Sequence, residues 1–364
     1  MTLLFILILF IHGLIHLIGY LKAYSLADLP DIRLSVSRPA GTLWLAASIL
    51  FMGTAIVFYF SVNGWWAGGI LAVVLSQGLV ISAWRDAKFA TIPNLIILLV
   101  SVIACANWLF DRNVEADIKR ILSEPEPAQN AILTSNAIED LPPPVQHWME
   151  RSGAVGYEKI SRVRLKQTGE MKTEPGQNEW ADTEAEQVFN VAVPSFVWAV
   201  EMEMMPMVTL SGQDLFVNGK GHMLIKLYSL ISVVDEKGDK IDRGTLQRFL
   251  SEIVWFPTAA INDYIEWEII DSTAAEAVIN WQDISEKVRF HFSENGDVKC
   301  VTADRYMGGG EAAERRPWEV TVLETSEVDG LRIPTEVEVS WELDSGTFTW
   351  YRFLVTDIDY DYYP

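Results

Sequence analysis

The sequence predicts an N-terminal four-helix transmembrane block followed by an α+β domain. We expect the sheet of that domain to be a strongly curved antiparallel sheet or open β-barrel with a plugging helix. Four apolar runs precede Asp111, alternating apolar and polar residues fill most of the chain after it, and one amphipathic helical pattern interrupts the alternation. We therefore divide the chain into a transmembrane domain at 1–110, a linker at 111–137 and a β-rich domain at 138–364.

Each apolar run is about 20 residues long, which is the length that spans the hydrocarbon core of a bilayer. The first run lacks the basic region and the small-residue cleavage site of a signal peptide, and three more runs follow it. We interpret all four as retained transmembrane helices. Their predicted bounds are Thr2–Tyr20, Gly41–Phe60, Trp66–Trp84 and Thr91–Phe110.

Basic residues in the connecting loops predict the orientation. The turn between the second and third runs has none, and Arg112, Lys119 and Arg120 after the fourth run oppose the trend. The prediction is an integral inner-membrane protein with four spans and both termini outside, so that the C-terminal domain is periplasmic or otherwise extracytoplasmic. The basic residues that support this orientation are Lys22, Arg33, Arg38, Arg85 and Lys88.

The chain after residue 110 is strongly acidic, with 23 basic and 46 acidic residues. This charge argues against nucleic acid as a partner and against an electrostatic grip on anionic lipid headgroups. The two cysteines, Cys105 and Cys300, lie far apart in predicted elements of different kinds. We expect no disulfide, and no cysteine spacing suggests a metal site.

The first run contains two histidines four residues apart, His12 and His16, which share one helix face. Three interpretations stay open: hydrogen bonding between helices, a proton or quinone-type site, and a metal or haem site. A metal would need further ligands, and Cys105 is the only soft candidate in the other runs. We expect Ser76 and Gln77 to be hydrogen-bond partners of the pair, and we predict no metal site.

A dozen alternating segments predict the sheet. Turn signals between them include Asn218-Gly219, Asn295-Gly296, Asp329-Gly330 and Ser345-Gly346, and DEKGD predicts a further turn at Asp235. Antiparallel strands with one apolar face suggest strong curvature. The predicted strands are 160–173, 179–191, 195–209, 213–218, 221–234, 265–271, 275–281, 286–293, 298–304, 318–324, 331–343 and 347–359.

One helix is predicted inside the sheet region, at 245–256, with Thr245 as its N-cap and Pro257 ending it. Its apolar stripe would cap or plug the concave side of the sheet, with Arg248, Glu252 and Trp255 on the other face. A shorter helix, carrying Val145, Trp148 and Met149, follows the proline run after the linker. The linker itself reads as a tether with one helical pattern at Val114–Leu122.

Large apolar residues on the predicted inner face suggest a wall for a flexible apolar ligand, because methionine and tryptophan make an adaptable surface. The alternative is a plain core filled by the helix. The residues that we assign to the wall are Phe196, Trp198, Met202, Met204, Phe216, Met223, Trp255, Trp267, Trp281 and Trp341.

The chain carries none of the local motifs of zinc proteases, serine hydrolases, dithiol sites, phosphate loops or dinucleotide-binding folds. The spacing of His12 and His16 matches a zinc-protease helix, but Gly13 stands where the general base would be. Arg248 and Glu252 could pair on one helix face, but we do not assign them a catalytic role. No catalytic residue and no cofactor is predicted.

Several motifs in order resemble a bacterial family of uncharacterised proteins, a domain of unknown function, over residues 138–360. They are LPPPVQHW, AEQVFNV with PSFVWAVEMEMMP, FVNGKGHMLIKLYSL, DRGTLQRFLSEIVWFPTA, and PWEV with DGLRIPTEVEVSWEL and YRFLVTDIDY. The resemblance implies no activity. The layout of strands around a plugging helix also resembles, more weakly, the open barrel of the lipoprotein-localisation carriers.

These patterns support three hypotheses. The first is a membrane-anchored extracytoplasmic module that binds a lipid, an acyl chain or another apolar ligand in the concavity of the sheet. The second is a scaffold of the cell envelope without a ligand, whose partners are other envelope proteins. The third is an envelope enzyme of unidentified type.

Overall fold

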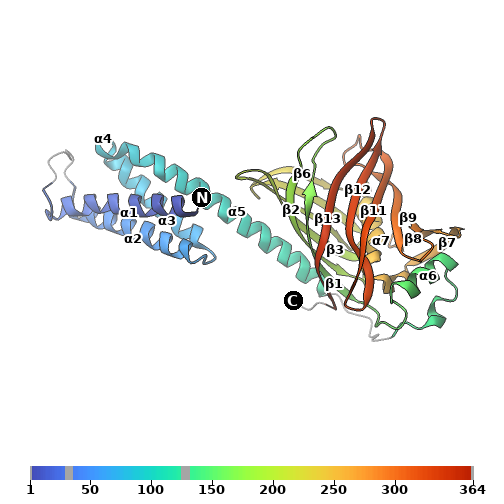
Figure 1. The fold of residues 1–364 in the computed structure, drawn as a ribbon. Helices are drawn as coiled ribbons and strands as arrows, with labels where there is room; N and C mark the ends of the chain where they lie inside the picture. The colour runs from blue at the N-terminus through green and yellow to red at the C-terminus, as the bar shows by residue number, and fades with distance from the viewer. Residues whose placement is uncertain (1, 29–35, 124–131, 362–364) are drawn as a thin grey trace. The chain divides into compact units, whose positions relative to one another are not determined.

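A computed structural model describes residues 2–28, 36–123 and 132–361 of the 364-residue chain. Arg33 and the linker stretch 124–131 lie outside these ranges. The chain forms two compact units, Met1–Asp111 and Arg112–Pro364, which we call the helical unit and the sheet unit and describe separately (Figure 1).

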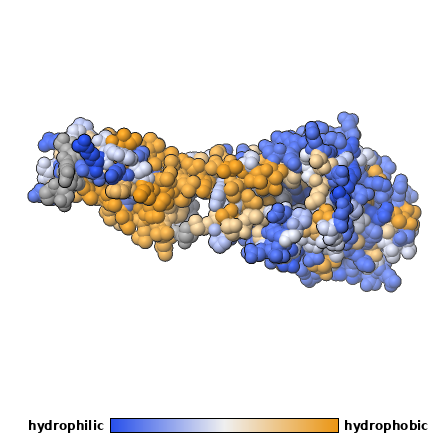
Figure 2. Space-filling view, turned by 90° about the horizontal axis from the view of Figure 1, so that it is seen from above, coloured by the Kyte–Doolittle hydropathy of each residue, from blue (hydrophilic) through white to orange (hydrophobic). Residues whose placement is uncertain are grey.

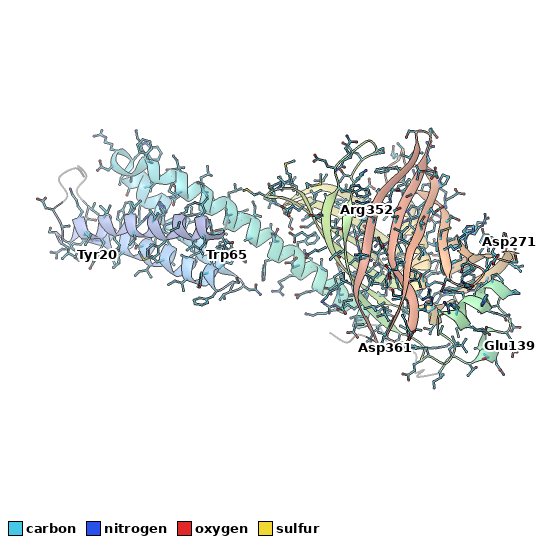
Figure 3. All side chains as sticks on the ribbon, in the orientation of Figure 1. Tyr20, Trp65, Glu139, Asp271, Arg352 and Asp361 are labelled. Atoms are coloured by element: carbon cyan, nitrogen blue, oxygen red, sulfur yellow. The ribbon has the colours of Figure 1, made fainter. Side chains whose placement is uncertain are left out.

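The helical unit contains four helices that are long and apolar enough to span a membrane, as the sequence predicts. Hydrophobic residues cover their surface in Figure 2, whereas hydrophilic residues dominate the surface of the sheet unit. Tyr20 and Trp65, labelled in Figure 3, lie near the end of the first helix and at the start of the third. The elements are α1 (Thr2–Ala23), α2 (Arg38–Tyr59), α3 (Trp65–Ser82), α4 (Trp84–Ala87), η1 (Lys88–Ala90) and α5 (Thr91–Leu122).

Glycines allow α1 and α2 to pack closely. A Cβ atom on Gly19 would collide with the ring of Trp44, and one on Gly41 would collide with Ala23. Small residues at such contacts are a common way to bring membrane helices together, because lipid tails provide no hydrophobic drive for helix association.

The last turns of α5 belong to the sheet unit and cover part of the outer face of the sheet. Ile121 is fully buried there against Val188, Val197 and Leu215. The side-chain amide of Asn190 donates to the carbonyl of Ile121 at 2.8 Å, which satisfies an orphan carbonyl of the last helical turn. The beginning of the predicted tether is therefore a docked helix.

The sheet unit continues with two short helical elements and then thirteen strands, interrupted by one helical segment. The helical elements are η2 (Ser135–Ile138), α6 (Pro143–Arg151), α7 (Asp239–Ser251), η3 (Glu252–Trp255) and η4 (Pro257–Ile261). The strands are β1 (Arg162–Met171), β2 (Ala181–Asn190), β3 (Ser195–Met205), β4 (Val208–Val217), β5 (Lys220–Leu227), β6 (Ile231–Lys237), β7 (Ile265–Asp271), β8 (Ala274–Trp281), β9 (Ile284–Phe292), β10 (Val298–Tyr306), β11 (Arg315–Val328), β12 (Leu331–Leu343) and β13 (Gly346–Tyr360).

All thirteen strands form one antiparallel sheet that does not close into a barrel. Its order is β6-β5-β4-β3-β2-β1-β13-β12-β11-β10-β9-β8-β7, so that the first and last strands pair in the middle. The edge strands β6 and β7 are joined through α7, η3 and η4. The turn at Asn218 and Gly219 has positive φ at both positions, as expected for a tight hairpin.

The sheet curves strongly around α7 (Figure 1). Helix α7 packs against both β5 and β9, which are nine steps apart in the strand order. Neighbouring strands are about 4.8 Å apart, so these two strands would be roughly 43 Å apart in a flat sheet. A helix is only about 10–12 Å wide, so the sheet must wrap around it. The predicted curved sheet with a plugging helix is confirmed.

Two local predictions are wrong. The helix begins at Asp239 rather than at Thr245, and the Thr245 hydroxyl donates to the carbonyl of Ile241 at 2.7 Å instead of capping a terminus. The expected turn at Asp235 lies within β6, and the strand predicted at 221–234 is divided into β5 and β6 by a turn at Tyr228 and Ser229. The helix start and the turn at Asp235 share one cause, since the acidic residues around Gly238 open a helix rather than a hairpin, whereas the turn at Tyr228 and Ser229 carries no glycine or proline signal.

Candidate functional site

A cavity of about 280 Å³ lies in the sheet unit between α7 and the concave face of the sheet. Strands β3–β5 and β10–β13 contribute to its walls, together with α7 and η3. Much of the wall is apolar, and its apolar side chains come from elements far apart in the sequence. Examples are Trp255, Val301, Trp318, Val337, Val339 and Phe353.

Strand alternation explains why these side chains meet. On β12, Val337, Val339 and Trp341 are buried and face inward at every second position. Trp318 on β11 pairs in register with Trp341, which places two large rings on the same wall. Trp255 follows α7 and is anchored by its indole nitrogen, which donates to the carbonyl of Pro334 at 3.0 Å.

Next to the apolar wall, α7 carries a buried ionic cluster. The Arg248 guanidinium donates to Asp214 at 2.6 Å and to Glu252 at 2.9 Å, and Gln187 donates to the other oxygen of Glu252 at 2.8 Å. Burial raises the pKa of Glu252 even though Arg248 opposes this effect. Burial lowers the pKa of Arg248, but the charges of Glu252 and Asp214 outweigh it and raise that pKa overall. The cluster thus holds one arginine between two carboxylates.

Arg305 on β10 is a second arginine of the cavity and is differently placed. Its guanidinium lies 4.4 Å from the centre of the Trp318 ring, and its Nη2 donates to the carbonyl of Gly244 at 2.8 Å. Burial, followed by the charge of Arg248, lowers the pKa of Arg305 to about 10. In the part of the chain that the structure describes, no carboxylate lies within ion-pair distance of it, and its buried Nε has no hydrogen-bond partner.

The cavity wall contains further buried donors without an acceptor. Within residues 2–28, 36–123 and 132–361, the lining atoms left without a partner are Nε of Arg305 and the indole nitrogens of Trp318 and Trp350. All three are N–H donors. Buried donors in folded proteins are nearly always paired, so such a group points to a missing acceptor such as a ligand or water.

The structure separates the ten residues predicted for the ligand wall into two groups. Those that line the cavity are Trp198, Met223, Trp255 and Trp341. The others pack in the surrounding core, and they are Phe196, Met202, Met204, Phe216, Trp267 and Trp281.

The second group has clear packing partners. Phe196 and Phe216 stack with ring centres 6.5 Å apart, and Met202 is 5% exposed. The ring centres of Trp267 and Phe290 are 5.1 Å apart, and the indole nitrogen of Trp267 donates to the carbonyl of Ala260 at 2.8 Å. Trp281 lies against Tyr264. These rings build the core beside the cavity rather than its wall.

Sequence reasoning did not single out Arg305, Trp318 or Trp350. The sequence does indicate the side of the sheet on which Arg305 lies. It comes four residues after the inward-facing Val301 on β10, so strand alternation puts both side chains on the same face. Alternation therefore places a charged residue on the apolar side of the sheet. Trp318 could have been found in the same way from its pairing with Trp341.

In the helical unit, the predicted intramembrane residues form a hydrogen-bonded network between α1, α3 and α5. Nε2 of His12 lies 2.8 Å from the side-chain oxygen of Asn94, and Nε2 of His16 lies 2.8 Å from the Ser76 hydroxyl. Gln77 accepts from Asn94 at 2.9 Å and does not bond either histidine directly. Asn94, which the sequence analysis missed, is the centre of the network.

Two further sequence predictions concern metals and cysteines. The described part of the chain contains no group of three or more histidine, cysteine, aspartate or glutamate side chains that could hold a metal ion. Cys105 and Cys300 are both free thiols. The two histidines hydrogen-bond side chains of α5 and α3, so both take part in contacts between helices.

Comparison with protein-family models identifies the chain. It belongs to a family of unknown function, DUF6920, whose model matches residues 139–360, more than half of the sequence. This confirms the resemblance to an uncharacterised domain family, and the match spans every strand of the sheet. No curated protein matches the chain.

Proposed function

We propose that this member of the family is a membrane-anchored extracytoplasmic module that binds a lipid, an acyl chain or another apolar ligand. The observation that carries the proposal is the cavity of about 280 Å³ between α7 and the concave face of the sheet. Protein interiors are close-packed, which makes an apolar space of this size a candidate binding site. It is near the lower end of small-molecule sites, which measure about 300–1,000 Å³.

The composition of the wall supports an apolar ligand. Tryptophan, valine and phenylalanine side chains dominate it, and Met223 and Met307 add flexible side chains that adapt to a chain of variable shape. The four apolar helices support a membrane anchor. The basic residues of the first and third connecting loops favour an inner-membrane location with the sheet unit outside the cytoplasm.

A second candidate is a scaffold that contacts envelope proteins and holds no ligand. Large apolar residues at the hairpin tips favour it, since Met205, Met207, Leu230 and Ile231 are between 48% and 64% exposed. The third candidate, an envelope enzyme, has no residue to which we assign catalysis.

A binding measurement with matched variants tests the proposal. The full-length protein in nanodiscs is titrated with the neutral fluorescent probe N-phenyl-1-naphthylamine, and empty nanodiscs give the background. Val339→Phe adds a ring to the cavity wall, and Val233→Phe makes the same change at an exposed position of β6. We expect the wall variant to weaken binding by at least about tenfold and the control to bind like the natural protein. Absence of probe binding to the natural protein would refute the proposal in favour of the scaffold.

The orientation has its own test. A reporter enzyme that is active only in the cytoplasm is fused after residue 364, and a second fusion is made in the turn between α2 and α3. We expect both fusions to be inactive. Strong activity of the C-terminal fusion would place the sheet unit in the cytoplasm.

A further inference from the structure

We propose that the cavity selects an anionic single-chain amphiphile, and that Arg305 binds its carboxylate or phosphate head. This inference rests on the proposed function and deepens it by naming the charge of the ligand and its polar anchor. The argument follows from the charges of the lining residues, the contacts of each cation and the unpaired donors.

The charge of the cavity wall is opposite to that of the rest of the unit. Acidic residues outnumber basic residues two to one after residue 110. In the wall, four cations face two carboxylates, Asp214 and Glu252. A cationic concavity inside an acidic domain favours an anion there, while the acidic exterior repels anions elsewhere. The four cations are Lys172, Lys240, Arg248 and Arg305.

Three of these cations already have partners. Arg248 is held by the two carboxylates, and the Lys240 ammonium donates to three backbone carbonyls at 2.8–3.0 Å, those of residues 310, 311 and 313. Lys172 lies over the ring of Trp180. Arg305 alone of the four combines a buried guanidinium nitrogen without an acceptor and a position with no carboxylate in contact. Asp214 and Glu252 act on the Arg305 charge only from beyond contact distance, and an anionic ligand would supply a direct counter-charge.

The unpaired donors match such an anion. The buried Nε of Arg305 and the indole nitrogens of Trp318 and Trp350 are all donors. A carboxylate or a phosphate offers only acceptor oxygens when ionised, whereas a hydrocarbon chain offers none. The Trp318 ring, which lies under the guanidinium, fixes the plane of Arg305 and so prepares it to bind an anion in two-point geometry.

The remaining wall suits the hydrocarbon part of the same molecule. Val337, Val339 and Phe353 line the cavity together with Arg305 and present no polar side-chain atom. One molecule with a charged head and an apolar chain thus uses both kinds of surface.

The test compares ligands that differ only in the head. The full-length protein in nanodiscs of zwitterionic lipid is titrated with dodecanoate and with dodecanol, each displacing the neutral naphthylamine probe, and acetate serves as a head without a chain. The variants are Arg305→Gln, which removes the charge, and Trp318→Phe, which removes one donor but keeps a ring. The control is Arg352→Gln on β13, whose side chain bonds Glu170 and does not line the cavity (labelled in Figure 3).

We expect dodecanoate to bind at least about tenfold more tightly than dodecanol, and acetate to displace nothing. Arg305→Gln should remove this preference without changing dodecanol affinity, Trp318→Phe should reduce it, and the control should keep it. Equal affinity for both ligands, unchanged in the Arg305 and Trp318 variants, would overturn the inference and leave the proposed function standing. If neither ligand displaces the probe, or the probe itself does not bind, the proposed function fails and this inference fails with it.

Discussion

The two buried polar clusters of this protein differ in whether their hydrogen bonds are complete. In the helical unit, His12, His16, Ser76, Asn94 and Gln77 bond one another at 2.8–3.0 Å, and none of them has a buried side-chain atom without a partner. In the cavity of the sheet unit, three buried N–H donors lack an acceptor among the described residues. The side chains of the first cluster satisfy one another, whereas the second cluster keeps donors that no described protein group accepts from.

The two clusters also differ in how easily the sequence draws attention to them as candidate sites. Histidines inside a predicted membrane span attract attention because charged and polar groups are expensive there. Their burial is compensated by side chains of two other helices. Arg305, on strand β10, instead keeps a buried N–H without an acceptor. Incomplete hydrogen bonding, rather than residue type, is therefore the observation on which our proposal rests.

The largest effect is expected from breaking the ionic cluster on α7. Glu252→Gln leaves Arg248 with Asp214 alone, and removing one partner of a buried pair typically costs about 3–5 kcal/mol. We expect a loss of about 3 kcal/mol in the free energy of unfolding, measured by urea titration of the full chain in detergent. The double variant Arg248→Met/Glu252→Leu should lose less than the two single changes together, because the only charge of the cluster that then loses its partner is Asp214, whose side chain is 20% exposed. Additive losses would contradict this account.

The second-largest loss of stability is expected from breaking the hydrogen-bonded network of the helical unit. Asn94→Leu removes the acceptor for His12 and the donor to Gln77 while adding apolar volume. We expect a loss of about 2 kcal/mol, because each buried group left unpaired costs about 1–3 kcal/mol and membrane values are at the low end. Ser101→Ala is the matched control, since the Ser101 hydroxyl is buried and has no partner. Thermal unfolding of the full chain in nanodiscs should show a clear decrease for Asn94→Leu and none for the control.

Replacing Arg305 should not lower the free energy of unfolding, in contrast to the two changes above. Arg305→Met removes a buried charge that no carboxylate contacts, at the loss of one hydrogen bond to the Gly244 carbonyl and one ring contact. Without ligand, we expect the free energy of unfolding to stay equal or to rise by about 1 kcal/mol, as is common when a functional residue is replaced. The same thermal measurement checks it. A decrease of the size expected for Asn94→Leu would mean that Arg305 is a structural residue.

The sequence predicts the fold better than it predicts the site. Strand alternation, glycine turns and the proline at the start of η4 indicate the sheet and the helix inside it, because they depend on local backbone preferences. Helix α7 starts early, because Asp239 and Asp242 favour a first helical turn and Gly238 adopts φ 111° before it. The helical pattern at Val114–Leu122 is confirmed as the end of α5. Its docking on the sheet was not predicted, because Val188 and Val197, which it covers, look by themselves like the solvent-facing side of a strand.

The cavity depends on contacts that no local pattern contains. Of the ten predicted wall residues, Trp198 lines the cavity while Phe196, two residues earlier on the same face, packs on Phe216. Alternation gives the face of a side chain but not its depth along the strand relative to α7. The set of donors that stay unpaired depends on the whole fold. The sequence could therefore place Arg305 on the inner face of the sheet, but it could not show that its Nε lacks an acceptor.

The smallest effect is expected where solvent can complete the bonding. Asp297, 21% exposed at its side chain, accepts from Arg332 at 2.7 and 3.2 Å and lies 3.5 Å from Arg151. The bond to Arg332 lowers the pKa of Asp297 from its usual value of 3.8, although partial burial opposes the shift. Because the folded-state pKa is the lower one, the stabilisation is complete above pH 3.8 and disappears as the pH falls through the folded-state value. Asp297→Asn should therefore cost only about 0.2–1 kcal/mol at neutral pH, the range of exposed ion pairs.

The pH dependence separates this pair from the buried clusters. As the pH falls below 3.8 and through the folded-state pKa of Asp297, the difference in unfolding midpoint between Asp297→Asn and the natural protein should shrink, because the natural side chain then becomes neutral as well. Asp344→Asn, at a carboxylate that is 91% exposed beside Arg316, should change nothing at either pH. A cost at Asp297 that matches the cost at Glu252, or that persists in acid, would show that exposure does not rank these clusters. The distinction between complete and incomplete bonding would then not be enough to identify the site.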